Sequence, residues 1–231
     1  MFDGSQQSAM VLSIDTCGTS GTVALARWTG DSVHVFDQKS IPGKTYSAQV
    51  IPEIRDLLAA HKTFVSDIAA IVVTSGPGSF TGIRIGLATA KGLAELHATP
   101  IVAVSRLAVL AHKAHTSAAA LDASRHEFYF GRYTADPAEQ LLARDHFLQL
   151  STTLAHDLGV CELSVHDLVP AATLVDPPTA ADAIDLALPR LRARDYDDPL
   201  TLDGNYLRRS DAEIFAKSPR PGSRQLDSPR P

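Results

Sequence analysis

Apolar residues recur along the chain with two different periods, and these predict an alternation of strands and helices. Three short apolar runs near the start are separated by turn-forming residues, which indicates an antiparallel meander. The following run has apolar residues at helical spacing, and the next is a β-branched run typical of a buried strand. The predicted strands are residues 10–14, 23–28, 33–36, 69–74, 101–104, 118–122 and 127–133, and the predicted helices are 47–61, 107–115 and a helix from the glycine-rich block to about residue 96.

The order strand, helix, strand, helix, strand after the meander predicts an α/β layer. The composition changes after Ser105, where an alanine- and histidine-rich helix begins. Between residues 136 and 198 the pattern weakens to short helical stretches and one strand near Thr173. Residues 218–231 hold four prolines and few apolar residues, so this tail is expected to be disordered.

Composition and charge exclude several classes of protein. The chain has 231 residues, is 45% hydrophobic and carries a net charge of -5, so general disorder and a grip on nucleic acid by bulk charge are both excluded. Cys17 and Cys161 cannot form a disulfide framework, which indicates a reducing compartment. No signal peptide and no apolar run long enough for a membrane span is visible. We therefore expect a cytoplasmic protein with no membrane contact.

A first candidate site is the turn that follows the first strand. Asp15, Thr16 and Thr19 lie there among glycines, where backbone N–H groups and hydroxyls could face a phosphate and the carboxylate could hold a metal-bound water. An ordinary hairpin turn selects the same residue types for conformational reasons. Taken alone, the motif favours the ordinary turn.

A second candidate is the block from residue 75 to 82, which follows the buried strand. Gly76 and Gly78 permit close backbone approach, and Ser79 or Thr81 can cap the next helix, whose free N–H groups form an anion site. The spacing fits neither a P-loop nor a dinucleotide-binding fingerprint. The alternative is a strand-to-helix turn with an ordinary cap.

The helix after this block carries a ridge of small residues. Gly82, Gly86 and Ala90 recur every four residues, with Leu87 on a neighbouring face. Each glycine inside a helix costs about 1 kcal/mol relative to alanine, so a packing reason is expected. The ridge fits close packing within the chain and a helix of a partner subunit equally well.

Catalytic and metal-binding patterns are missing. His112 and His115 have no acidic ligand near them in the sequence, so no metal site is predicted. Neither Ser79 nor Cys17 has a general base at a recognisable spacing. The sequence therefore predicts no catalytic residue.

Several segments resemble the TsaB (YeaZ) family. They are residues 13–16, 22–25 and, most specifically, Gly-Pro-Gly-Ser-Phe-Thr-Gly-Ile-Arg-Ile-Gly and its continuation at 76–93, followed by 121–123, 127–129 and 205–208. The likeness covers residues 10 to 135 well and then the last element. It implies an actin-like ATPase fold (ASKHA class, ribonuclease H-like) with subdomains at 9–106 and 107–217, the first carrying the partner-binding helices. With this resemblance, we expect the helix that carries Gly82, Gly86, Leu87 and Ala90 to bind the partner subunit.

The resemblance also implies a function. TsaB is the non-catalytic partner of TsaD, which transfers a threonylcarbamoyl group to adenosine beside the anticodon of tRNAs that read codons starting with A; the ATPase TsaE also joins. It implies no cofactor of the chain's own, leaves open ATP or ADP at the partner interface, and gives contact with tRNA only through the complex. One departure stands out: Tyr46-Ser47 replaces the family's usual His-Ser pair, which puts any role of that histidine in doubt.

Two other classes of function stay open. An autonomous actin-like ATPase or a peptidase of the glycoprotease type would place a nucleotide between the Asp15 turn and the 76–82 block. A homodimeric binding module would use the small-residue helix for self-association when TsaD is absent.

Overall fold

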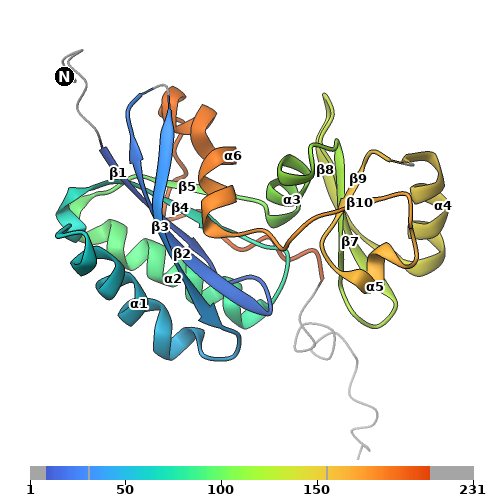
Figure 1. The fold of residues 1–231 in the computed structure, drawn as a ribbon, viewed down its shortest axis with the longest axis horizontal. Helices are drawn as coiled ribbons and strands as arrows, with labels where there is room; N and C mark the ends of the chain where they lie inside the picture. Colours follow the sequence, from blue (N-terminus) through green and yellow to red (C-terminus); the bar gives the residue numbers. More distant parts are fainter. Residues whose placement is uncertain (1–8, 31, 155, 209–231) are drawn as a thin grey trace, which may run out of the picture.

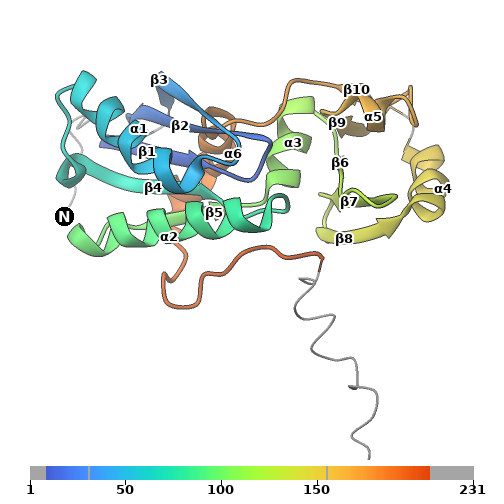
Figure 2. The same ribbon diagram turned by 90° about the horizontal axis from the view of Figure 1, so that it is seen from below.

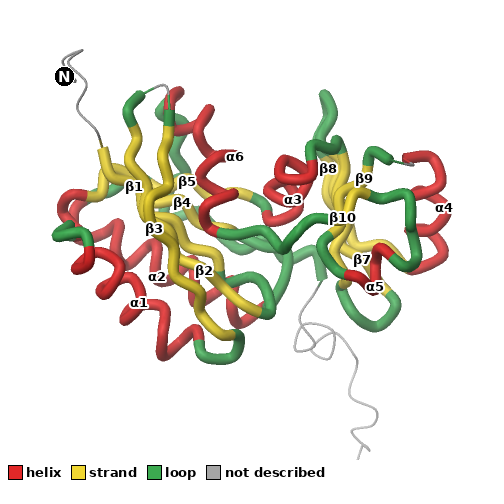
Figure 3. Tube along the Cα trace, in the orientation of Figure 1, coloured by secondary structure: helices red, strands yellow, loops and turns green. Residues whose placement is uncertain are grey.

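The computed structural model describes residues 9–30, 32–154 and 156–208, and these form two β-sheets, each flanked by helices (Figures 1 and 3). The first sheet has the order β3-β2-β1-β4-β5, with β1 antiparallel to β2 and parallel to β4. Its strands are β1 (Ala9–Asp15), β2 (Ser20–Trp28), β3 (Val33–Pro42), β4 (Ile68–Thr74) and β5 (Ile101–Val104).

Helices cover both faces of the first sheet (Figures 1 and 2). On one face α1 (Tyr46–Ala60) and α2 (Phe80–His97) pack side by side. Between them in the chain, a short 3-10 helix, η1 (Val65–Asp67), leads into β4. On the other face lies α6 (Ala180–Ala193). Because both faces are covered, β1 and β4 are apolar along most of their length rather than alternating.

The second sheet has the order β10-β9-β6-β7-β8. One face packs on α3 (Arg106–Ala114), and the other on α4 (Arg144–Leu154) and α5 (Leu163–His166). Its strands are β6 (Ala118–Asp122), β7 (Glu127–Arg132), β8 (Ala138–Ala143), β9 (Leu158–Val160) and β10 (Thr173–Leu174).

The predicted α/β class and the predicted strands and helices are confirmed, with ends shifted by a few residues. The predicted division of the chain differs from the observed packing at one element. The predicted second subdomain, residues 107–217, includes helix α6. The apolar face of this helix packs instead on β1, β2, β4 and β5 of the first sheet. The reason is that this face of the sheet would otherwise expose buried valines and alanines to water. The predicted disordered tail, 218–231, lies outside the described residues.

Within the described ranges, no helix has the length and apolar character that crossing a bilayer requires.

Candidate functional site

The Asp15 turn and the glycine-rich block meet where β1 and β4 end. Asp15 is buried, and its Oδ1 accepts a hydrogen bond from the Cys17 N–H at 2.9 Å. Burial raises the pKa of the Asp15 carboxyl, while the positive charge of Arg106 opposes that shift. Thr16 is also buried, and its hydroxyl donates to the Gly82 carbonyl at 2.7 Å. Asp15 therefore stabilises the turn itself, and Thr16 holds the turn against α2.

The glycine-rich block is held against the same turn. The Ser79 N–H donates to the Cys17 carbonyl at 2.8 Å, and the Ser79 hydroxyl accepts from the Gly82 N–H at 3.2 Å. Ser79 is thus the cap of α2, as the sequence predicted. A side chain at Gly78 would collide with the Cys17 backbone, and Gly76 has a φ of +111. The close approach of the two loops therefore requires glycine at position 78, and the positive φ favours glycine at position 76.

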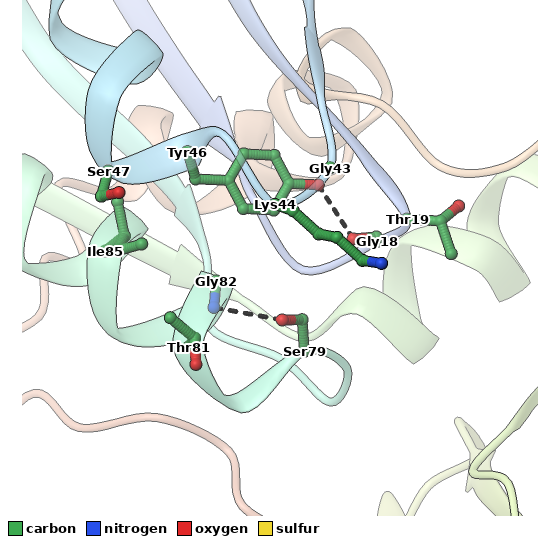
Figure 4. A pocket seen from close by; sticks show the side chains of 10 residues that line it. All are labelled: Gly18, Thr19, Gly43, Lys44, Tyr46, Ser47, Ser79, Thr81, Gly82 and Ile85. Carbon is green, nitrogen blue, oxygen red and sulfur yellow. Dashed lines mark hydrogen bonds between the residues drawn. The ribbon is translucent and has the colours of Figure 1, made fainter.

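Each of the two loops forms one wall of a pocket of about 490 Å³ (Figure 4). The β3–α1 turn and the start of α1 complete it, and the Tyr46 hydroxyl donates to the Gly18 carbonyl at 2.8 Å. Burial raises the pKa of Tyr46 to about 12. The pocket is lined by Gly18, Thr19, Gly43, Lys44, Tyr46, Ser47, Ser79, Thr81, Gly82 and Ile85.

The lining of this pocket suits an anion. Among the described residues that line it, Lys44 is the one charged side chain, and four others carry aliphatic hydroxyls. The N-termini of α1 and α2 also open onto it, and these favour negative charge. The structure therefore brings three of the predicted residues, Thr19, Ser79 and Thr81, to one pocket, with Asp15 and Thr16 behind its wall.

The small-residue ridge lies inside the chain, which corrects its assignment as a partner surface. Gly82, Gly86, Leu87 and Ala90 are all buried. Side chains at Gly82 and Gly86 would collide with Thr16, because α2 lies directly against the turn after β1. Of the two interpretations that the sequence left open, close packing within the chain is the observed one. The exposed side of α2 carries Thr81, Arg84 and Ala88 instead.

Neither candidate nucleophile is activated. Cys17 is buried, its thiol donates to the Thr74 carbonyl at 3.3 Å, and burial raises its pKa well above the usual value. The Ser79 hydroxyl is engaged as the helix cap. No group of three or more metal-ligating side chains occurs among the residues described.

The same two predicted loops also line a second cavity, a cleft of about 410 Å³ between the two subdomains, at which sequence reasoning missed one residue. Arg106, the first residue of α3, lines it together with Glu162 and Arg208. No sequence signal marks Arg106, because an arginine at a helix start is usually exposed. Its burial arises from the placement of α3 between α6 and the second sheet (Figure 1).

The sequence of the chain is similar to those of proteins named for a tRNA modification. The family model described as "TsaD: tRNA N6-adenosine threonylcarbamoyltransferase" matches residues 40–159, about half of the chain. The tRNA threonylcarbamoyladenosine biosynthesis protein TsaB of Escherichia coli is 33% identical over 132 residues, covering 54% of this chain and 55% of that protein. TsaB of Bacillus subtilis is 35% identical over 127 residues, covering 53% and 54%. The matched stretch thus spans about half the length of these curated relatives.

The fold has a close match among solved structures. YeaZ from Pseudomonas aeruginosa aligns with a TM-score of 0.67 at 23% identity, over 86% of this chain and all of that chain. This likeness confirms the predicted actin-like, ribonuclease H-like fold of two subdomains. Taken with the family model and the curated relatives, it shows that the chain belongs to the TsaB (YeaZ) family, within the proteins that the TsaD model describes.

Proposed function

We propose that this chain is a non-catalytic subunit in the biosynthesis of threonylcarbamoyladenosine in tRNA, and that it acts by pairing with a TsaD protein. The observation that carries the proposal is the match to curated TsaB proteins, whose names assign them to this biosynthesis. The transfer itself would reside in TsaD, and the ATPase TsaE and the tRNA would be met only in the complex.

The exposed sides of α1 and α2 support a docking role. The two helices lie side by side on the outer face of the first sheet (Figure 2). Ile51 of α1 is 51% exposed, so this helix presents a large apolar side chain to solvent. Ala48 of α1 and Ala88 of α2 are exposed as well, and Ile85 of α2 lines the pocket. This surface takes the place of the buried glycine ridge as the proposed partner face, and self-association in the absence of TsaD would use it too.

The pocket of Figure 4 opens beside this surface. Ser47 and Ile85 belong both to its lining and to the two helices that form the proposed partner face. A TsaD bound there would cover the pocket mouth. ATP or ADP at the partner interface would therefore meet Lys44 and the start of α2.

The rival function is an autonomous ATPase or peptidase. A peptidase needs an activated nucleophile, but the Ser79 hydroxyl caps α2 and the Cys17 thiol is buried with a raised pKa. An ATPase of the actin-like class would use Asp15, but that carboxylate is buried against the Cys17 N–H and lines neither cavity. Measurable ATP turnover by the purified chain, lost in Asp15→Ala, would favour this rival.

Co-purification tests the pairing. The tagged chain is expressed with the TsaD of the same organism, and the captured TsaD is quantified for wild type, Ile51→Glu and Leu163→Glu. Leu163 is a matched control, because it is 68% exposed but lies on α5 of the second subdomain. A buried charge at the centre of an interface weakens binding at least about tenfold. We expect this loss for Ile51→Glu alone; equal capture of all three chains would contradict the proposed surface.

A further inference from the structure

Residues 202–208 cross from the first subdomain to the second on the side opposite the β10–α6 connection (Figure 2). The β5–α3 connection, which contains Ser105, crosses between these two segments. The chain itself therefore joins the subdomains at the middle and along one side, whereas the side of residues 202–208 is held by non-covalent contacts. Residues 205–208 also belong to the resemblance to TsaB, and the proposed function gives them no role.

Asn205 and Tyr206 attach this segment to the first subdomain. The Asn205 N–H donates to the Ser75 carbonyl at 2.8 Å, directly after β4. The Tyr206 ring packs on the Phe80 ring, with their centroids 4.7 Å apart. A Cβ added at Gly76 would lie 3.0 Å from the Asn205 carbonyl oxygen, so the segment lies close against the glycine-rich block.

Leu207 and Arg208 attach the same segment to the second subdomain. Leu207 packs against the apolar cluster that α3 forms with β6 and β7. The Arg208 guanidinium pairs with the Glu127 carboxylate of β7 and donates to the Ser124 carbonyl at 3.1 Å. Neighbouring residues of one short segment thus bind different subdomains.

The side chain of Asn205 links the two subdomains directly. Its Nδ2 donates to Oε2 of Glu139 on β8, and the other oxygen of that carboxylate accepts from the Tyr133 hydroxyl at 2.6 Å. Tyr133 also forms a side-chain hydrogen bond with Ser105, in the β5–α3 connection. Burial and the negative charge of Glu139 raise the pKa of Tyr133, so the phenol remains a donor at neutral pH.

These contacts close a ring around the middle crossing. The Ser75 N–H donates to the Val104 carbonyl at 2.9 Å, at the end of β5 and directly before Ser105. From Ser75 the ring continues through Asn205 and then through Glu139 and Tyr133 of the second subdomain back to Ser105. Glu139 accepts from donors on both sides, and hydrogen bonds to a charged acceptor are stronger than those between neutral groups.

We propose that Asn205 and Glu139 form a clasp that fixes the angle between the two subdomains, and that breaking the clasp lets them rotate about the β5–α3 connection. Domains of one chain move relative to each other unless a large apolar interface prevents it. On the side of residues 202–208, hydrogen bonds to a carboxylate supply this restraint, so a change at either residue releases it. The clasp belongs to the chain alone and does not depend on pairing with TsaD.

Exchanging the amide and the carboxylate of the pair gives a specific test. Asn205→Asp places two carboxylates against each other and breaks the clasp. Combining Asn205→Asp with Glu139→Gln restores a donor opposite an acceptor, and the glutamine oxygen still accepts from Tyr133. Asp203→Asn is the control, because Asp203 is exposed on the same segment and its carboxylate accepts from the Gly204 N–H at 2.7 Å.

Nitrogen-15 relaxation of the full chain measures the rotational correlation time of each subdomain separately. We expect one common value in wild type, in Asp203→Asn and in the double variant, and two different values in Asn205→Asp. Amide exchange gives a second measurement at the same site. The amide of residue 205 should exchange at least about tenfold faster in Asn205→Asp, the change that corresponds to losing one hydrogen bond to a charged group, and should recover in the double variant.

Three results would overturn the proposal: a common correlation time in Asn205→Asp, no recovery in the double variant, or two different correlation times already in wild type. The last of these needs no variant. If Asn205→Asp does not fold, Asn205→Ala takes its place with the same expected result, because it removes the donor without adding a charge.

Discussion

At the scale of single residues, glycines decide how closely α2 can lie on the sheet. Gly86 faces Thr16, and a side chain there would collide with the Thr16 hydroxyl. Gly92, further along the same helix, has nothing within 4 Å of an added Cβ. The two positions carry the same residue for different reasons, since only the first is set by packing.

Substituting alanine for Gly86 and for Gly92 distinguishes the effect of packing from that of helix propensity. Gly86→Ala is expected to lower the free energy of unfolding by about 1–3 kcal/mol, because the added methyl group overpacks a tight contact. Gly92→Ala is expected to leave stability unchanged or raise it by up to about 1 kcal/mol, from helix propensity alone. Urea denaturation of both variants measures the difference. Equal effects would mean that α2 can move away from β1 without cost.

Tyr46 also acts as a single residue, because its hydroxyl ties α1 to the Gly18 carbonyl. Tyr46→Phe is expected to lower the free energy of unfolding by about 1 kcal/mol at neutral pH. The folded-state pKa of Tyr46 is raised from 10 to about 12, so its contribution is complete below pH 10 and is lost as the pH rises toward 12. The stability difference between wild type and Tyr46→Phe should therefore narrow between pH 10 and 12. A difference that grows over this range would show that burial of the phenol is not the cause.

At the scale of elements, residues 202–206, which follow α6, cross α2 and bind to it; we call this segment the strap. The Asn205 N–H donates to the Ser75 carbonyl at 2.8 Å, and the Lys91 ammonium donates to the Leu202 carbonyl at 2.6 Å. The Tyr206 ring packs on Phe80, with centroids 4.7 Å apart, and Arg84 lies over Phe80. The strap therefore fastens the end of the described chain to α2.

Removing the aromatic contact should release the strap. Tyr206→Ala is expected to destabilise the protein by about 1–3 kcal/mol and to speed amide exchange at residues 202–206. Leu200→Ala is the control, because Leu200 is 92% exposed on the same segment and should change stability by less than about 0.5 kcal/mol. Unchanged exchange in Tyr206→Ala would show that the hydrogen bonds alone hold the strap.

The sequence predicted some helices and strands well and others poorly, depending on whether the signal was local. Residues 69–74 and the helix after the glycine block were evident because a buried β-branched run and a cap with helical spacing are local signals. Strand β8 was missed, since its position depends on pairing with β7 rather than on its own periodicity. Helix α4 lies in the stretch where only unplaced short helices were predicted, and its buried residues pack on β7. The site followed the same rule: Ser79 was predicted as a cap, but the burial of Arg106 depends on contacts between distant segments.

At the scale of the whole molecule, the chain returns to its first subdomain before it ends. Helix α6 covers the face of the first sheet opposite α1 and α2. It buries Ile184, Ala187 and Leu191 against Val11, Val72 and other residues of β1, β2, β4 and β5. The first subdomain is therefore assembled from two separate parts of the sequence.

A fragment of residues 9–106 tests this assembly. It lacks α6 and would expose one apolar face of a five-stranded sheet, so we expect it to be insoluble or to lack a cooperative unfolding transition. Residues 9–208 serve as the control and should unfold cooperatively. A well-folded 9–106 fragment, judged by dispersed amide resonances, would show that the sheet is stable without α6.

The measurement that tests the central claim most directly is reconstituted tRNA modification. Purified TsaD from the same organism is supplied with threonylcarbamoyl-adenylate and tRNA, with and without this chain, and threonylcarbamoyladenosine is quantified in the digested tRNA. The proposed function predicts strong modification with both proteins, weak modification without this chain, and weak modification with Ile51→Glu. Full modification by TsaD alone, with no gain on adding the chain, would contradict it.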